Sequence, residues 1–323
     1  MKAVSTKVKL SLVVPCFNEA ENVRPFTEAC RQVLEGAVDS YELVFVNDGS
    51  RDDTWQELKK LAAEKLCPMK LVCFSRNFGK EAAMYAGLQH AAGDYVTVID
   101  ADLQQRPEVA LEMVRLLDDH PEYDAVAAYQ ETRHEGKFTA WCKGLAYKLL
   151  NKMCEINFRE GASDFRTFRR GMVEAILSMK EYHRFSKGIF SWVGFNTHYI
   201  PYNAEERNAG TTSWSFGKLL KYAMEGTISF TTVPLKISTV VGVVMFFASI
   251  LYIIGVIIEK LAFGIATSGY ATIVILILLI GGVQLITLGI MGDYIARIYI
   301  QSKNRPVFII KETADNVTEE RSE

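Results

Sequence analysis

Residues 97–108 read TVIDADLQQRPE, and the fold and chemistry of the chain can be predicted outward from this stretch. The apolar run at 95–99 predicts a buried strand that delivers Asp100 and Asp102 to its end. Because side chains alternate along a strand, both carboxylates are expected on one side, and Gln104 continues the alternation. Paired hard oxygens suit Mg²⁺ or Mn²⁺, which keeps coordination positions for substrate phosphates. Most Asp-x-Asp pairs are solvated strand ends, so the metal hypothesis depends on the surrounding residues.

Apolar strands and helical patterns alternate around this stretch with short connections. Strands are expected at 10–14, 41–46, 69–74, 95–99 and 123–128, and helices at 20–35, from Thr54 onward and at 81–91. This order predicts an α/β fold with a mostly parallel, Rossmann-like sheet covered by helices on both faces. Ligands bind such sheets outside the carboxyl ends of the strands. One crevice should therefore be lined by the polar residues that follow the strands, which are Asp48, Arg76, Asn77, Asp100 and Asp102.

Composition and missing motifs exclude several classes of protein. The 36 basic and 38 acidic residues nearly cancel, so no general attraction to nucleic acid is expected. Neither G-x-G-x-x-G nor a P-loop motif occurs, which removes the main support for a dehydrogenase or a P-loop NTPase. The six cysteines form no C-x-x-C pair and are expected to be reduced and mostly buried. The first apolar run stops at Pro15 and is too short for a signal peptide, so the first domain is expected in the cytosol.

Six motifs in order give the chain a family resemblance from about Leu10 to Phe308. It resembles the family 2, GT-A-type glycosyltransferases, and more narrowly the polyprenyl-phosphate sugar transferases, which include dolichol-phosphate mannose synthases and bactoprenol glucosyltransferases. The motifs are VVPCFNEAENV, VNDGSRDDT, FSRNFGKEAAMYAGL, DADLQQRPE, SDFRTFRR and RFSKGIFSWVGF.

The resemblance implies roles for individual residues. Nucleotide binding is implied for Pro15, Phe17, Glu19, Asp48, Arg76, Lys80 and Asp100, and metal binding for Asp100, Asp102 and Gln104. Contact with the acceptor or its phosphate is expected of Arg133, Arg166 and Arg207. The chain departs from the family at Asn47, where Asp is common, and at Ser213, where relatives often have Lys.

Asp164 is the second carboxylate of interest. On position alone, an Asp before a helix is most often an N-cap. The resemblance instead makes Asp164 the catalytic residue of an SDFR-type motif, either as the base or as a group that orients the acceptor. Both roles stay open, because an acceptor phosphate is already an anion at neutral pH.

Two uncharged segments, 237–258 and 269–292, are long enough to cross a bilayer as helices. Lys236 precedes the first, and Arg297, Lys303 and Arg305 follow the second, so the positive-inside rule places both outer flanks in the cytoplasm. Segments 138–154 and 215–230 are basic and amphipathic; the first is either an ordinary packed helix or, like the second, a helix on the membrane surface. The tail after Lys311 is expected to be disordered.

The expected organisation is a cytoplasmic GT-A domain at 1–214, an interfacial segment at 215–235, a transmembrane hairpin at 236–292 and a cytoplasmic tail at 293–323. This describes a multi-pass protein of the bacterial inner membrane. The resemblance implies an inverting transfer of a sugar, with glucose from UDP-glucose favoured over a GDP-sugar, to undecaprenyl phosphate at the cytoplasmic leaflet. The product would be a lipid-linked donor for modification of cell-envelope glycans such as O-antigen.

Two alternatives stay open at this point. One is an inactive, membrane-tethered protein that binds nucleotide sugars. The other is a processive polysaccharide synthase, whose usual Q-x-x-R-W motif has no counterpart here because no Trp follows an Arg. Lipid chain length and homo-oligomerisation are not determined by these patterns.

Overall fold

The computed structural model describes residues 8–130, 162–202, 231–263 and 269–316. The chain divides into two compact units, Met1–Lys221 with Pro306–Glu323, and Tyr222–Arg305. The predicted segments 138–154 and 215–230, and with them Arg133, Arg207 and Ser213, lie outside the described residues. The domain boundaries expected from the sequence stay predictions.

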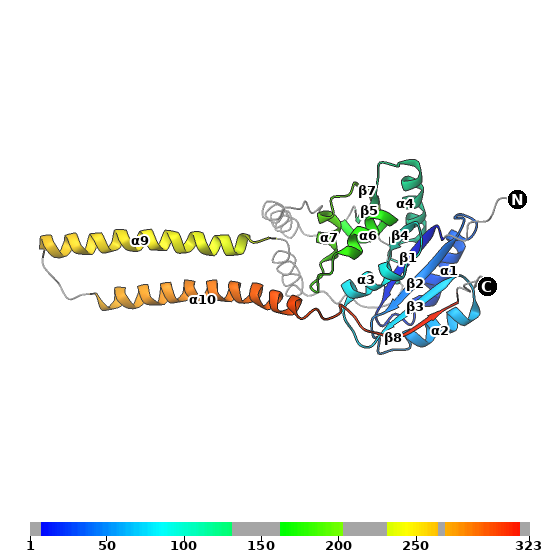
Figure 1. Ribbon diagram of the computed structural model, residues 1–323, viewed down its shortest axis with the longest axis horizontal. Helices are drawn as coiled ribbons and strands as arrows, with labels where there is room; N and C mark the ends of the chain where they lie inside the picture. Colours follow the sequence, from blue (N-terminus) through cyan, green and yellow to red (C-terminus); the bar gives the residue numbers. More distant parts are fainter. Residues whose placement is uncertain (1–7, 131–161, 203–230, 264–268, 317–323) are drawn as a thin grey trace. The chain divides into compact units, whose positions relative to one another are not determined.

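The first unit is built on an eight-stranded sheet of order β7-β5-β6-β4-β1-β2-β3-β8 (Figure 1). The strands are β1 (Leu10–Cys16), β2 (Tyr41–Asn47), β3 (Met69–Phe74), β4 (Tyr95–Val98), β5 (Ala125–Gln130), β6 (Ala162–Arg169), β7 (Thr197–Tyr202) and β8 (Ile310–Asp315). Strands β4, β1, β2 and β3 are parallel neighbours, as the alternating sequence pattern predicts.

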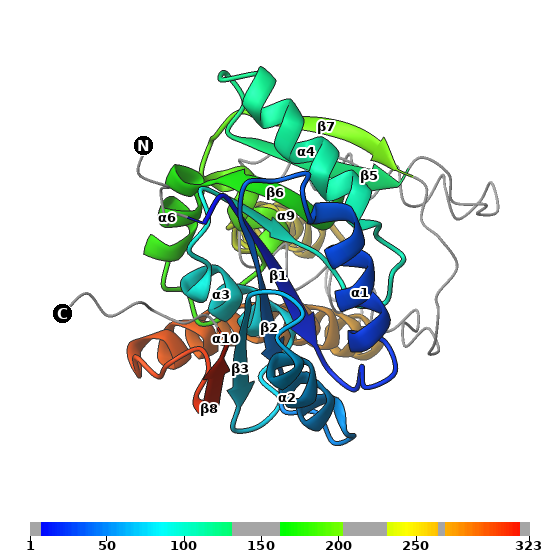
Figure 2. The same ribbon diagram turned by 90° about the vertical axis from the view of Figure 1, so that its right-hand side faces the viewer.

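Helices cover both faces of this sheet (Figure 2). On one face, α1 (Val23–Leu34), α2 (Thr54–Glu64) and α4 (Pro107–Asp119) enclose the main core with alternate residues of β1, β2 and β3. On the other face, α3 (Lys80–His90) packs on β2 and β3 and meets α6 (Arg170–Ser178). The short helix α7 (Ser186–Trp192) contacts β6. Gly87 allows α3 to approach β1, because a Cβ there would lie 2.1 Å from Val13 Cγ1.

Strand β6 is the main feature that the sequence did not predict. It lies between β4 and β5 and is antiparallel to both, so the sheet is mixed rather than continuously parallel. Its register pairs Thr97 with Thr167 and Val98 with Arg166, and the two threonine hydroxyls are 2.7 Å apart. Continuing this register beyond Val98 brings residue 100 beside residue 164. The insertion of β6 therefore carries Asp164 to the end of β4.

The expectation of a disordered tail after Lys311 is wrong for residues 312–316, and residues 317–323 lie outside the described part of the chain. Strand β8 pairs antiparallel with β3, from Lys70 opposite Asp315 to Phe74 opposite Ile310. At its end, the Asn316 side chain accepts a hydrogen bond from Met69 N at 2.7 Å and donates to two carbonyls, those of Ala62 and Cys67. The segment is polar because one face of an edge strand is exposed to solvent. A polar composition is also typical of disordered segments, so the two cannot be told apart by composition. Its pairing with β3 supplies the order.

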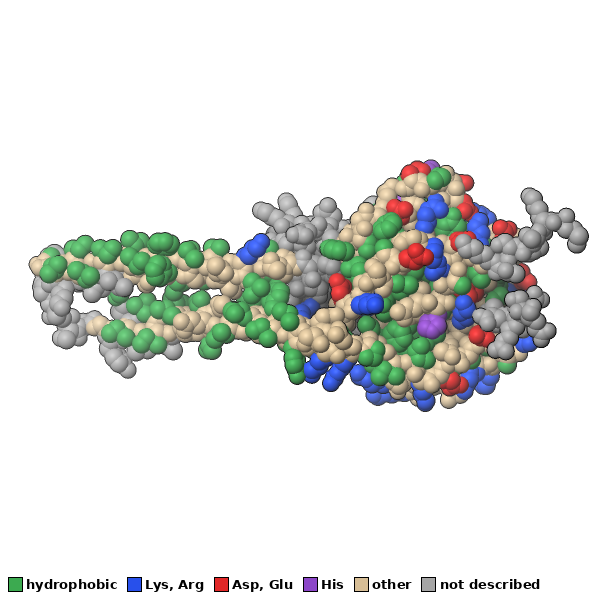
Figure 3. Space-filling model, in the orientation of Figure 1, with side chains coloured by type: hydrophobic (Ala, Val, Ile, Leu, Met, Phe, Trp, Pro, Cys, Tyr) green, Lys and Arg blue, Asp and Glu red, His purple; other side chains and the backbone are tan. Residues whose placement is uncertain are grey.

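The second unit contains α9 (Val233–Phe263) and α10 (Tyr270–Ser302). Helix α9 extends beyond its predicted span at both ends, and α10 extends beyond its span at the C-terminal end. Each helix contains a window long and apolar enough to cross a membrane, at Val233–Tyr252 and Leu279–Ser302. Apolar side chains cover the visible sides of both helices (Figure 3), and those that are described are largely exposed. A helix apolar on all sides is expected to lie against lipid. The prediction of two transmembrane helices is consistent with this unit.

Candidate active site

The loop after β1 is held by the loop after β2. Asn18 adopts a left-handed conformation with φ of +58°, and its backbone N–H donates to Ser50 Oγ at 2.9 Å. Glu19 N donates to Thr54 Oγ1 at 2.8 Å. These bonds fix the loop while leaving the Phe17 side chain 42% exposed. An exposed aromatic ring on a fixed loop suits stacking against a nucleotide base, and the nucleotide contact expected of Phe17 stays a prediction.

Asp48 supports a neighbouring loop. Its carboxylate is 3% exposed and accepts hydrogen bonds from Phe78 N at 2.6 Å and Gly79 N at 2.9 Å. Burial raises the pKa of Asp48, and these two bonds oppose the rise. Gly49 has φ of +61°, and a Cβ there would lie 2.4 Å from the carbonyl carbon of Arg76. The Asp-Gly turn thus sets the position of the loop at 75–79, and the nucleotide contact expected of Asp48 stays a prediction.

The Asp-x-Asp motif lies on a turn rather than on a strand. Strand β4 ends at Val98, and Leu103 has φ of +59°, so strand alternation does not govern Asp100, Asp102 and Gln104. The backbone N–H of Gln104 donates to Asp102 Oδ1 at 3.1 Å. Strand alternation was expected to place the two carboxylates on one side, and that expectation was wrong. The two residues are still close to each other, because both lie on one tight turn.

Lys80 forms salt bridges with Asp100 and Asp164, the two carboxylates that are expected to take part in the reaction. Its Nζ lies 2.6 Å from Asp100 Oδ1 and 3.6 Å from Asp164 Oδ2. Lys80 is the first residue of α3, whereas the two aspartates come from the end of β4 and from β6. Packing around the ammonium group disfavours its charge, but Asp100 and Asp164 outweigh that effect and raise the pKa of Lys80. The site thus contains a fixed cation between two anions.

Asp164 is not a helix cap, because it lies within β6 and α6 begins only at Arg170. Its Oδ1 atom is buried and has no hydrogen-bond partner among the described residues. Burial opposes the charge of Asp164, but Lys80, Lys187 and Arg166 together lower its pKa below the ordinary value. Asp164 is therefore ionised at neutral pH, with one carboxylate oxygen left to accept a further contact.

Two residues near this group, Gln105 and Glu81, were not predicted from the sequence. Gln105 is 6% exposed; its side-chain oxygen accepts from Asp100 N at 3.0 Å, and its amide nitrogen lies 3.4 Å from Ser163 Oγ. Glu81 accepts hydrogen bonds from the backbone N and the hydroxyl of Ser186. Gln105 and Glu81 fall inside motifs that were quoted, but nothing in a single sequence shows which side chains of a motif face each other.

Two of the predicted arginines lie elsewhere. Arg166 is 2% exposed, its Nε donates to Ser163 O, and its guanidinium lies 5.0 Å from the Phe190 ring centre. This burial argues against direct contact with an acceptor. Arg76 lies over the Phe78 ring at 4.4 Å and forms no salt bridge with a described carboxylate. The expected crevice is thus assembled around Lys80, Asp100 and Asp164, with Arg76 beside a separate pocket.

Among the described residues, no three His, Cys, Asp or Glu side chains are grouped closely enough to hold a metal ion. Asp100 and Asp102 nevertheless supply hard carboxylate oxygens at one turn, and Gln104 follows them. A divalent cation that keeps ligands from water and substrate needs only one or two protein carboxylates. The donor set therefore fits Mg²⁺ or Mn²⁺.

The family model "Glycosyl transferase family 2" matches residues 11–177, and a second model, "GtrB C-terminal hairpin", matches residues 233–298. The chain belongs to glycosyl transferase family 2. The family 2 match covers the sheet from β1 to α6 and includes Lys80, the Asp-x-Asp turn and Asp164. The predicted family, its GT-A fold and the glycosyltransferase activity are thereby confirmed.

Relatives of this family 2 glycosyltransferase match it over nearly their full length. The bactoprenol glucosyl transferase of Shigella phage SfV is 41% identical over 305 residues, covering 94% of this chain and 98% of the relative. The prophage bactoprenol glucosyl transferase homolog of Escherichia coli (strain K12) is 40% identical over 305 residues, covering 94% and 99%. A crystal structure of glucosyl-3-phosphoglycerate synthase from Mycobacterium tuberculosis, with Mn²⁺ and uridine diphosphate, is 18% identical with a TM-score of 0.49, covering 70% of this chain and 80% of that one.

Proposed function

We propose that this glycosyltransferase transfers glucose from UDP-glucose to undecaprenyl phosphate at the cytoplasmic leaflet of the bacterial inner membrane. The observation that carries the proposal is the extent of the similarity to bactoprenol glucosyl transferases, which includes both the catalytic domain and the C-terminal hairpin. A lipid acceptor would also explain why one chain contains both a catalytic sheet domain and two apolar helices, because the acceptor's prenyl chain lies in the bilayer. The product would be a lipid-linked glucose for modification of cell-envelope glycans.

Asp100 and Asp102, with Gln104, would hold Mg²⁺ or Mn²⁺ together with the diphosphate of the donor. When bound, the cation would neutralise charge that develops on the departing nucleoside diphosphate. Lys80 would add a second positive charge at the same place, since its Nζ lies 2.6 Å from Asp100. Phe17 would stack on the base, while Pro15 and Glu19 shape the loop that carries it. These residues bind and orient the donor.

Asp164 would act on the acceptor side of the donor. A general base works best when its pKa is near the working pH, whereas Lys80, Lys187 and Arg166 lower the pKa of Asp164. The acceptor phosphate needs no deprotonation, because it is an anion at neutral pH. We therefore favour the orienting role for Asp164. Attack from the face opposite the leaving group would invert the anomeric carbon and give a β-linked product from an α-linked donor.

The activity is tested with purified full-length protein, undecaprenyl phosphate and radiolabelled UDP-glucose, UDP-galactose, UDP-N-acetylglucosamine and GDP-mannose. Label from UDP-glucose should enter an organic-extractable lipid in preference to the others. A different preferred donor would replace glucose in the proposal. If no donor labels a lipid although UDP-glucose binds, the protein is a nucleotide-sugar binder and the proposal fails.

The metal is tested separately. EDTA should abolish transfer, and Mg²⁺ or Mn²⁺ added in excess should restore it. Asp102→Asn should lose activity while melting at the parental temperature, because it removes one carboxylate charge without changing side-chain volume. Full activity in EDTA would exclude the metal role of Asp100 and Asp102.

A further inference from the structure

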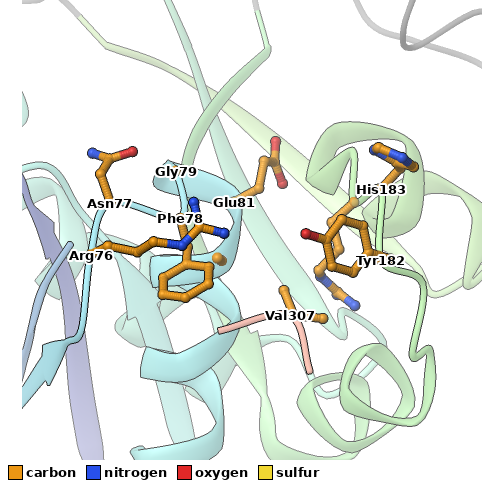
Figure 4. Close-up of a pocket in the computed structure, with 10 residues that line it drawn as sticks. Arg76, Asn77, Phe78, Gly79, Glu81, Tyr182, His183 and Val307 are labelled. Carbon is orange, nitrogen blue, oxygen red and sulfur yellow. The ribbon is translucent and has the colours of Figure 1, made fainter. Parts of the chain in front are cut away.

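A pocket of about 340 Å³ lies beside the active site, outside the Lys80–Asp100–Asp164 group. One wall is the loop and helix start at 76–82, the second is the segment 182–184, and the third is Val307 (Figure 4). In this view Arg76 and Tyr182 point toward one another across the pocket, while His183 points away. We name it the Arg76–Arg184 pocket after its two guanidinium groups.

Two positive charges face this pocket without a direct salt bridge. Neither Arg76 nor Arg184 lies within 4.0 Å of a carboxylate of the described residues. Arg184 stacks on Tyr85 at 4.0 Å and donates to Met179 O at 2.5 Å, but its buried Nε has no hydrogen-bond partner. A buried donor on a charged group without a partner is costly, and an oxyanion in the pocket would offset part of that cost by pairing with the guanidinium charge.

The acidic groups near the pocket weaken this positive character only in part. Glu81 and Glu181 act on Arg184 through their charge at longer range. The Glu81 carboxylate is already bound by Ser186, and burial together with the charge of Asp164 raises its pKa to about 7. Near neutral pH, Glu81 is therefore only partly ionised. Two permanent guanidinium charges outweigh it.

The third wall connects the pocket to the membrane helix through the chain. Val307 follows Ser302, the last residue of α10, by five residues. Val307 and Phe308 pack against the cluster around Val46, Val72 and Phe74. Phe308 stacks on Phe74 with ring centres 4.8 Å apart. The pocket is thus built partly from the segment that follows α10 in the chain.

We propose that the Arg76–Arg184 pocket binds a phosphate group, distinct from the diphosphate held at Asp100 and Asp102. Planar guanidinium groups bind phosphate oxygens in pairs, and the Tyr182 hydroxyl can donate a further bond. The chemistry of recognition is the same for a phosphate carried by a prenyl chain, a phosphate of an anionic phospholipid and free inorganic phosphate. Arg76 is then assigned to this pocket instead of the donor diphosphate.

Binding is measured on the full-length protein in detergent at constant ionic strength, with farnesyl phosphate, dihexanoyl phosphatidylglycerol and inorganic phosphate as probes. Arg184→Gln and Arg76→Gln should each weaken the tightest of the three by about 10–100-fold, the effect of losing a charge-assisted hydrogen bond. The affinity of Arg184→Gln for UDP should stay within about twofold of the parental value. Arg115→Gln, exposed on α4, is the matched control and should bind all probes normally.

The tightest probe identifies the source of the phosphate, so each of the three results supports the site. The proposal fails if none of the probes binds the parental protein, or if both variants bind as well as the parent. It also fails if both variants lose UDP affinity as much as phosphate affinity, because the pocket would then belong to the donor. These binding measurements do not depend on sugar transfer, so their failure is distinguishable from failure of the proposed function.

Discussion

At the scale of single residues, the proposed mechanism depends on Lys80, whose ammonium group lies between the carboxylates of Asp100 and Asp164. Asp164→Asn keeps side-chain volume and removes one of the two negative charges beside the ammonium group. We expect UDP-glucose binding to persist and turnover to fall. Loss of a general base costs roughly 10²–10⁴-fold, and loss of an orienting group should cost less. Initial rates at saturating substrates measure the difference, and a parental rate would remove Asp164 from the mechanism.

Glu81 gives a second residue-scale prediction, on stability. Its pKa is raised from 4.5 to about 7 in the folded protein, so the folded state holds the proton more tightly than the unfolded state does. This group therefore lowers stability as pH rises from about 4.5 to 7, and the full penalty is present above pH 7. Glu81→Gln keeps an acceptor for Ser186 and should stabilise the protein at pH 8 by about 1–3 kcal/mol.

Melting temperatures at pH 5 and pH 8 check this prediction. The gain from Glu81→Gln should be present at pH 8 and absent at pH 5. Glu112→Gln, exposed on α4, is the control and should change neither value. An equal gain at both pH values would mean that packing, not ionisation, is responsible.

At the scale of elements, β8 attaches the segment after the membrane hairpin to the catalytic sheet. Asn316→Ala removes three side-chain hydrogen bonds, to Met69 N, Ala62 O and Cys67 O. At about 1 kcal/mol for each bond, the loss totals about 3 kcal/mol, so local opening of β8 should become roughly 100-fold more frequent. Hydrogen exchange of the β3 and β8 amides in the full-length protein measures this opening.

The control for β8 is Lys311→Ala on the exposed side of the same strand, which should exchange like the parental protein. Unchanged protection in Asn316→Ala would show that the backbone ladder with β3 suffices to hold the strand.

At the scale of the whole molecule, the prediction concerns topology. Two apolar helices with basic outer flanks should place both termini in the cytoplasm and the connection at 259–268 on the far side. A cysteine at Ser268 should react with an impermeant thiol reagent added to intact cells, whereas one at Ser322 should not. The parental protein gives the background, and its Cys16, Cys30, Cys67 and Cys73 are free and buried. Labelling at Ser322 alone would reverse the orientation.

Local patterns in the sequence were sufficient for much of the fold. The strand β3 was predicted at its observed bounds, Met69–Phe74, and β1, β2 and β4 within two residues of theirs. The hydrophobic period of a strand or helix and its flanking turn residues are properties of a short segment, so they can be read without tertiary structure. The same holds for α9 and α10, because crossing a bilayer requires a long run of apolar residues.

Only the tertiary structure decided how these segments form a site. Asp164 reaches Lys80 because β6 pairs with β4 across more than sixty residues of chain, and β8 completes the sheet opposite β3 across more than two hundred. The left-handed conformation of Leu103 and the burial of Asp48 likewise depend on packing. The sequence by itself determined which groups were available: three aspartates, a lysine and two apolar spans. The tertiary structure determined which of these groups lie together. The energy of strand pairing and side-chain packing depends on residues that are distant in the sequence, and no local pattern specifies them.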